Sequence, residues 1–257
     1  MKIGVCVGTD IEKARLVKET GFDFVESHCQ DIVKASEETL KEFKELGIPV
    51  IAANCFMGMR IVGKEKDEEA IKAYLAELFK RADYLGLKYI VFGSSGARKM
   101  TEGMTLEGTR AEIVYFLKNL VVPFAEKYKI TIAIEPLRTA ECNVINTVEQ
   151  GIEIAEKVDS PFVRVLADVK HMDSNNENLD SLKDLGKWLV HAHTSNPHPD
   201  ESTGKKRTYP AKGDEFDQND FFAPLKAAGV EQCSVEADVI DFKKDVVSAY
   251  EVLKELR

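Results

Sequence analysis

The sequence lacks several features that mark whole classes of protein. Its 257 residues include only five cysteines, an odd number with no Cys-x-x-Cys pair. This argues against a disulfide framework and leads us to expect a reduced, cytoplasmic protein. No stretch approaches the ~20 consecutive apolar residues of a membrane-spanning helix, and the first residues do not resemble a signal peptide. We therefore expect no membrane partner.

Basic residues are also outnumbered by acidic ones. The chain has 35 Lys and Arg against 44 Asp and Glu, which gives a formal net charge of −9. An acidic surface repels phosphate backbones, so we expect no nucleic-acid partner. Apolar residues make up 44% of the sequence and charged residues 31%, which is an ordinary composition for a globular protein with a full core.

Short apolar runs alternate with amphipathic segments along the whole chain. We predict strands near 2–7, 22–26, 49–53, 88–92, 130–134, 163–167, 188–192 and 232–236. Helical patterns follow at 10–20, 37–46, 67–85, 106–127, 145–158, 177–186, 218–228 and 241–256. Strands that are apolar throughout are typical of a parallel sheet covered on both faces. Eight strand–helix units without a linker favour one domain, residues 1–257, folded as a (β/α)8 TIM barrel. An open doubly wound sheet is the alternative.

Two predicted connections are longer than a barrel needs. They span residues 54–66 and 194–217. Long loops in a compact domain are usually functional or disordered. Both follow strands, so we expect both at the C-terminal mouth, where barrel active sites are found.

Side chains that can bind metal close the last four predicted strands. They are, in strand order, Glu135, Asp168, His193 and Glu236. Taken singly, each could be a strand end, a helix cap, a core histidine or a solvated carboxylate. Three converging carboxylates would raise each other's pKa, and a divalent cation resolves that conflict. Three oxygens and one imidazole nitrogen suit Mn²⁺, Mg²⁺, Co²⁺ or Fe²⁺ better than a structural zinc site.

Two histidines lie close together in the seventh predicted strand. We expect His191 and His193 to point to opposite sides of the strand, so that only one faces the mouth. His193 lies nearer the C-terminal edge and is therefore our predicted ligand. His191 is predicted to be structural.

A metal beside paired carboxylates suggests proton chemistry. The cation would stabilise the enediolate formed when a hydroxyketone loses a proton from carbon. Glu135 and Glu236 could remove and return that proton, one on each face of the substrate. This predicts a metal-dependent isomerase or epimerase of a small sugar. A dehydratase or lyase stays open, because loss of hydroxide can follow the same proton abstraction.

Several motifs resemble a known family. They are Glu135-Pro-Leu followed by Glu141, Asp168 followed by His171-Met, His191-Ala-His193, and the Ser-Val-Glu236 strand end. These are similar to the sugar phosphate isomerase/epimerase family of xylose-isomerase-like barrels, which includes ketose 3-epimerases and hydroxypyruvate isomerases. The resemblance is strong over residues 90–240 and weak in the N-terminal third.

The resemblance implies roles for single residues. It implies that Glu135, Asp168, His193 and Glu236 bind the metal, and that Glu135 and Glu236 are the acid/base pair. It further implies that Glu141 holds a substrate hydroxyl and that His171 binds a substrate oxygen. Arg207 is similar in position to a substrate-contacting arginine, although its loop is longer here. A solvated loop tip is the alternative for this residue.

One departure from the family pattern concerns the wall of the substrate site. Lys170 stands where relatives often carry an aromatic residue, which puts an apolar wall in question. Phe56, Met57 and Met59 in the first long loop could supply an apolar cover or an oligomer contact.

The family resemblance also sets the expected cofactor and partners. We expect one divalent cation, Mn²⁺ first, with Mg²⁺, Co²⁺ or Zn²⁺ as alternatives, and a small sugar as substrate. By analogy with relatives, a homodimer or homotetramer is the assembly to consider. Endonuclease IV, a distant relative, has histidines on its second and third strands, whereas the third strand here ends in Ala53-Asn54. A non-catalytic sugar-binding barrel is disfavoured because all four ligand candidates are present.

Overall fold

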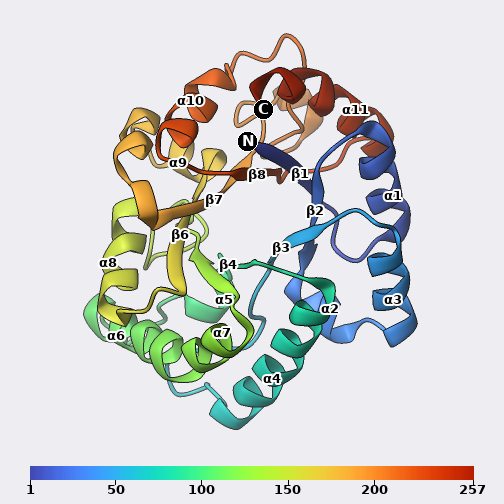
Figure 1. The fold of residues 1–257 in the computed structure, drawn as a ribbon. Helices are drawn as coiled ribbons and strands as arrows, with labels where there is room; N and C mark the ends of the chain where they lie inside the picture. The colour runs from blue at the N-terminus through green and yellow to red at the C-terminus, as the bar shows by residue number, and fades with distance from the viewer.

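The computed structural model describes residues 1–257 and consists of eight parallel strands that close into a barrel inside a ring of helices (Figure 1). The strands follow one another around the barrel in chain order, and β1 pairs with β8 to close it. The predicted (β/α)8 TIM barrel is therefore confirmed. No helix combines the length and the apolar character needed to cross a membrane.

The predicted strands agree with the observed ones to within two residues at each end. The strands are β1 Lys2–Cys6, β2 Phe24–His28, β3 Val50–Asn54, β4 Tyr89–Phe92, β5 Thr131–Ile134, β6 Val163–Asp168, β7 Leu189–Thr194 and β8 Gln232–Val235. The α-helices are α1 Ile11–Thr20, α2 Cys29–Lys34, α3 Glu37–Glu45, α4 Glu68–Leu85, α5 Ser95–Arg98, α6 Leu106–Tyr115, α7 Val122–Tyr128, α8 Val148–Val158, α9 Val169–Ser174, α10 Asn219–Ala227 and α11 Phe242–Leu253.

Two predicted helices differ from the observed structure. The segment predicted as helix at 177–186 is instead a pair of 3₁₀ turns, Leu179–Asp184 and Gly186–Trp188, because Gly186 has a positive φ of 48° that an α-helix cannot continue through. The predicted helix 106–127 contains a π-helical segment, Phe116–Val121, between α6 and α7. Pro123 at the start of α7 has no N–H to donate, so the regular α-helical bonding is interrupted there.

Helix α4 illustrates how the sequence positions the outer ring. Its first turn is capped by the Asp67 side chain, which accepts a hydrogen bond from the Ala70 N–H. Buried Ile71, Leu75, Leu78 and Ala82 recur at helical spacing and face the barrel. The helix ends at Gly86, whose φ of 86° is the left-handed conformation typical of a helix C-terminus.

The first long connection, residues 54–66, packs against the barrel. Phe56 is fully buried and makes edge-to-face contact with Phe92, with ring centroids 5.7 Å apart. Tyr74 on α4 donates a hydrogen bond to the Phe56 carbonyl at 2.6 Å. Phe56 therefore belongs to the core and is not available for contact with another subunit.

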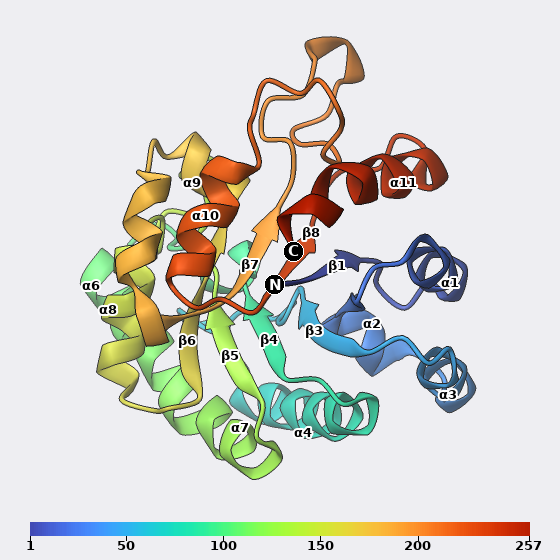
Figure 2. The same ribbon diagram turned by 45° about the horizontal axis from the view of Figure 1, so that its top comes forward.

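The second long connection, between β7 and α10, rises above the C-terminal ends of the strands (Figure 2). Its base is closed by an antiparallel bridge between Asn196 and Thr208. The Lys170 ammonium donates to the Pro197 carbonyl at 2.7 Å. Lys170 is thereby turned toward this loop, and its departure from the aromatic pattern affects the loop's attachment rather than a wall of the mouth.

Candidate metal centre at the barrel mouth

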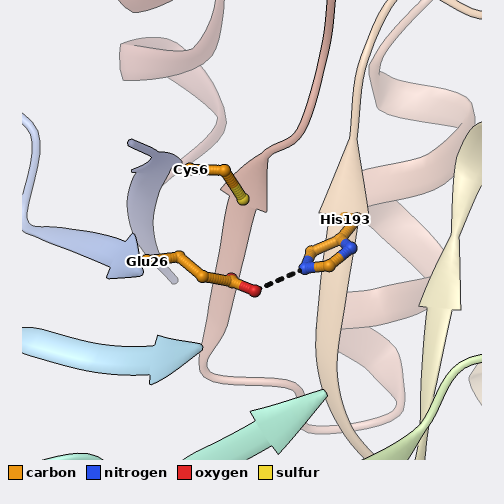
Figure 3. A group of neighbouring side chains, drawn as sticks. All are labelled: Cys6, Glu26 and His193. Atoms are coloured by element: carbon orange, nitrogen blue, oxygen red, sulfur yellow. Dashed lines mark hydrogen bonds and ion pairs between the residues drawn. The ribbon is translucent and has the colours of Figure 1, made fainter. Parts of the chain in front are cut away.

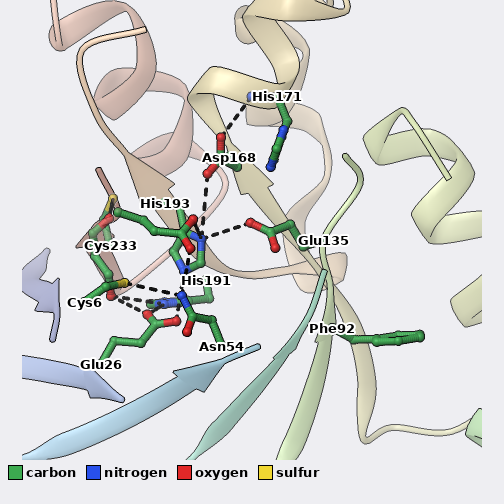
Figure 4. Close-up of polar contacts among 12 residues, drawn as sticks. Cys6, Glu26, Asn54, Phe92, Glu135, Asp168, His171, His191, His193 and Cys233 are labelled. Carbon is green, nitrogen blue, oxygen red and sulfur yellow. Dashed lines mark hydrogen bonds and ion pairs between the residues drawn. The ribbon is translucent and has the colours of Figure 1, made fainter. Parts of the chain in front are cut away.

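The four predicted ligands meet at the C-terminal mouth of the barrel, and Figure 4 labels three of them, Glu135, Asp168 and His193. Glu135 follows β5, Asp168 ends β6, His193 lies in β7 and Glu236 follows β8. One donor atom of each residue lies within 4.8 Å of those of the other three. Parallel strands end at the same edge, so four neighbouring strand ends deliver their side chains to one point.

His193 is at the centre of this group. Its Nδ1 lies 3.0 Å from Glu135 Oε1, 3.1 Å from Glu236 Oε2 and 3.8 Å from Asp168 Oδ2. Its side chain is fully buried. Burial disfavours a charged ring, but the carboxylates of Glu26 and Glu236 outweigh it and raise the pKa of His193 well above its ordinary value. One ring nitrogen and three carboxylates therefore converge on one point, as the ligands of a metal ion do.

Arg207 reaches the same group from the loop after β7. Its guanidinium lies 2.8 Å from Asp168 Oδ2 and 2.7 Å from Glu236 Oε2. Burial disfavours the ionised form of Glu236, but Arg207 and His193 outweigh it and lower its pKa well below the ordinary value. Arg207 balances only one of the three carboxylates, and a divalent cation would reduce the remaining negative charge. The oxygen-rich donor set and its charge fit such a cation.

Glu26, the middle residue of β2, lies beneath the group and was not singled out by sequence reasoning. Its Oε1 lies 3.0 Å from His193 Nε2, on the side of the ring away from the carboxylates (Figure 3). Its Oε2 accepts from the Ser234 hydroxyl at 2.7 Å and lies 2.9 Å from His191 Nε2. A signal was present, since Glu26 ends a predicted strand as the other acidic residues do.

The expectation that His191 and His193 point to opposite sides of β7 is wrong. Successive residues of a strand alternate, so residues two apart share a face. Both rings point into the barrel, with centroids 5.4 Å apart, and both contact Glu26 (Figure 4). His191 is not at the mouth because it lies one layer deeper.

Two further residues that sequence reasoning missed support the ligands. Asn54 at the end of β3 donates from Nδ2 to Glu236 Oε1 at 2.8 Å. Arg98 on α5 is fully buried, and its guanidinium donates to the Phe92 carbonyl at 2.6 Å and to the Glu135 carbonyl at 2.5 Å. Arg98 thus joins the ends of β4 and β5. The loop that carries it looks like a plain turn in the sequence.

A cavity of about 390 Å³ opens above the four ligand candidates. Glu141, His171 and Arg207 line it together with Glu135 and Glu236, so the structure brings all predicted substrate residues to one space. Met57 also lines the cavity, whereas Met59 packs beside the core. The predicted apolar cover is therefore reduced to a single methionine of that loop.

Arg138 orients two of the three predicted substrate-binding side chains, His171 through its backbone N–H and Glu141 through its guanidinium. His171 Nδ1 lies 3.2 Å from the Arg138 N–H and accepts from it, so in the neutral ring Nε2 carries the hydrogen. The Arg138 guanidinium holds the Glu141 carboxylate at 2.6 Å and 2.8 Å. Both side chains are thus fixed before any substrate arrives.

The lack of a side chain at Gly93 leaves room for the Glu135 carboxylate. A Cβ at this position would lie 2.1 Å from Glu135 Oε2, far inside contact distance. The second carboxylate oxygen of Glu135 therefore occupies the space that any other residue at position 93 would fill. It faces the cavity and accepts no hydrogen bond from the protein.

Known proteins similar to this chain convert sugars. It is 27% identical over 197 residues to 3-dehydro-D-guloside 4-epimerase of Escherichia coli (strain K12), covering 73% of this chain and 74% of the relative. It is 25% identical to D-psicose 3-epimerase of Enterocloster bolteae, covering 69% and 62%. With inosose isomerase of Bacillus velezensis it shares 24% identity, covering 83% and 78%.

Solved structures show the same fold. A D-psicose 3-epimerase crystallised in the presence of D-fructose superposes with a TM-score of 0.81 at 20% identity, covering 99% of this chain and 98% of that one. The apo 3-keto-D-glucoside 4-epimerase from E. coli gives 0.82 at 24% identity, covering 99% of both. The IOLI protein, which has a bound zinc atom, gives 0.76 at 22% identity, covering 100% and 98%. The family described as xylose isomerase-like TIM barrel matches residues 14–256, and this chain belongs to that family.

Proposed function

We propose that this protein is a divalent-metal-dependent isomerase or epimerase of a small sugar or hydroxyketone. The observation that carries the proposal is the convergence of three carboxylate oxygens on His193 Nδ1 beneath a polar cavity. The named activities of the sequence relatives, all on sugars or a cyclitol, support the substrate class. The five unpaired cysteines support a cytoplasmic location.

Glu135, Asp168, His193 and Glu236 would hold the cation, with Mn²⁺ the first expectation. When bound, it would supply positive charge that stabilises the enediolate of a hydroxyketone. The oxygen-dominated donor set supports Mn²⁺ or Mg²⁺, and the zinc in the IOLI structure keeps Zn²⁺ as an alternative.

The two glutamates differ in how free their oxygens are. Glu135 Oε2 faces the cavity beside Gly93 and accepts no hydrogen bond from the protein, so it is placed to take a proton from substrate carbon. Glu236 has both oxygens engaged, one by Asn54 and the other by Arg207 and His193. We assign Glu135 as the more readily available base and Glu236 as its partner on the other face.

The remaining cavity residues would orient the sugar. His171 presents its Nε2–H to a substrate oxygen, because its Nδ1 already accepts the Arg138 N–H. Glu141, held by Arg138, would accept a hydrogen bond from a substrate hydroxyl. Arg207 would donate to a substrate oxygen from beside Asp168. Fixing these groups beforehand lowers the cost of aligning carbon and base.

The test is solvent deuterium exchange. Mn²⁺-loaded protein is incubated in D₂O with ketohexoses, ketopentoses, 3-ketoglycosides, inosose and hydroxypyruvate, and exchange is followed by NMR. We expect deuterium at one carbon of one substrate class, and loss of that exchange with EDTA. Exchange that survives complete metal removal would overturn the metal-dependent mechanism. A dehydrated product would make the protein a lyase instead, and no exchange with any substrate would overturn the proposed substrate class.

A further inference from the structure

Glu26 is a fully buried carboxylate that the proposed chemistry does not use. Its side chain lies in the barrel interior one layer below the mouth (Figure 3). Burying a carboxylate is costly unless hydrogen bonds replace its water. Three side chains supply them here: His193 and His191 through ring nitrogens, and Ser234 through its hydroxyl.

Each of these neighbours can donate a hydrogen, and an ionised carboxylate can only accept. Glu26 Oε1 therefore takes the Nε2–H of His193 at 3.0 Å, and Glu26 Oε2 takes the Ser234 hydroxyl at 2.7 Å. In the neutral ring, which is the form that can bind a cation, the hydrogen of His193 is then on Nε2. The lone pair is left on Nδ1, which is the nitrogen directed at the three carboxylates of the mouth.

The side chains that donate to Glu26 are themselves held in place. His191 stacks on Tyr89 with ring planes 1° apart and centroids 5.8 Å apart, which sets the direction of its Nε2 toward Glu26. His191 comes from the same strand as His193 and Ser234 from the next one, so the backbone of β7 and β8 holds both donors. Glu26 cannot rotate without leaving these donors unpaired.

We infer that Glu26 is the positioning residue of the metal centre, because it fixes the tautomer and the ring orientation of His193 so that Nδ1 faces the cation. The inference rests on the proposed metal centre. A metal-binding histidine whose second nitrogen is held by a carboxylate is a better ligand, and loss of such a partner commonly weakens metal binding about 10–100-fold. Glu26 touches neither cation nor substrate in this assignment.

The first test compares Mn²⁺ affinity by isothermal titration calorimetry in the wild type, Glu26→Gln and Ser27→Ala. Ser27 is the matched control, since it is buried in the same strand and its hydroxyl makes no hydrogen bond. We expect the Mn²⁺ Kd of Glu26→Gln to rise about 10–100-fold and that of Ser27→Ala to stay within about twofold. An unchanged Kd in a folded Glu26→Gln protein would overturn the inference alone. A wild type that binds no Mn²⁺ would overturn the metal centre and the inference together.

The second test needs only the wild type and so does not depend on folding of a variant. The protein is loaded with diamagnetic Zn²⁺, and the ring nitrogens of His193 are assigned by ¹⁵N NMR. We expect hydrogen on Nε2 with its proton shifted downfield by the bond to Glu26, and no hydrogen on Nδ1. Hydrogen on Nδ1, or an Nε2 proton without the downfield shift, would overturn the inference, because a cation on Nδ1 leaves hydrogen on Nε2 by itself and only the bond to Glu26 shifts that proton.

Discussion

The two halves of the barrel mouth contribute different kinds of side chain. The half built by β5–β8 supplies all four ligand candidates. The half built by β1–β4 supplies none, but three of its side chains each support one ligand: Glu26 bonds His193, Asn54 bonds Glu236, and Arg98 bonds the Glu135 carbonyl. The ligand half, β5–β8, should therefore decide whether the site binds metal and reacts. The supporting half, β1–β4, should decide how well the ligands are aligned.

The largest effect should follow a change in the ligand half. Glu135→Gln removes both a ligand charge and the proposed base, so we expect deuterium exchange into substrate to fall about 10³-fold. NMR under saturating Mn²⁺ measures it. Glu149→Gln on the exposed start of α8 is the control and should keep full exchange. If Glu135→Gln kept exchange within threefold of the wild type, Glu135 would not be the base.

Metal binding by the ligand half should also raise the free energy of unfolding. Mn²⁺ at about 100 times its Kd should raise the free energy of unfolding by about 2.7 kcal/mol, because only the folded chain holds the site. Asp168→Asn should lose most of this increment while keeping the hydrogen bond to the His171 N–H that starts α9. Urea unfolding with and without Mn²⁺ measures both. Equal stabilisation of the two proteins would show that Asp168 is not a ligand.

In the supporting half, Arg98→Met should lower the free energy of unfolding. It leaves the Glu135 carbonyl without a donor, at about 1–3 kcal/mol, and removes one of the two donors of the Phe92 carbonyl, which keeps the Glu135 N–H; relief from burying a charge offsets part of this. We expect a net loss of about 2 kcal/mol in urea unfolding. Arg60→Met is the comparison, since half-buried Arg60 makes one bond to Gly96 of the same loop and should cost under about 1 kcal/mol. Equal losses would contradict a special role for Arg98.

The smallest effect expected is that of Asn54→Ala. Glu236 Oε1 loses its 2.8 Å donor, and we expect the Mn²⁺ Kd to rise about tenfold, the lower end for loss of a group that orients a ligand. Calorimetry with Mn²⁺ measures it. Gln30→Ala alters the same cavity without touching a ligand and should leave the Kd unchanged. A tenfold rise in both variants would point to a general loosening of the mouth instead.

The same contrast explains what could be predicted from the sequence. Each ligand candidate sits at the end of an apolar run, so strand pattern and residue type were enough to place Glu135, Asp168, His193 and Glu236 together. Barrel geometry follows from eight repeats, because parallel strand ends share one edge.

The supporting contacts could not be predicted because they join residues far apart in the chain. Glu26 and His193 are separated by 167 positions, and Asn54 and Glu236 by 182. A charged residue in a short turn, such as Arg98, is usually solvated, and only the closed barrel shows that it is buried. The misplaced His191 had a different cause, since the two-residue strand period itself puts it on the same face as His193.

The loop after β7 is hydrogen-bonded to neighbouring elements at its base, whereas its tip is hydrogen-bonded only to itself. Three contacts hold its two ends and thereby Arg207: the Asn196–Thr208 bridge, the bond from Lys170 to the Pro197 carbonyl, and the bond from the Lys206 N–H to the Asp238 carboxylate. Residues 199–205 bond only among themselves. Doubling the length of a flexible loop costs only about 0.6 kcal/mol. This tip is therefore a natural grafting point, where segments could be exchanged while the ligand strands and Arg207 stay as they are.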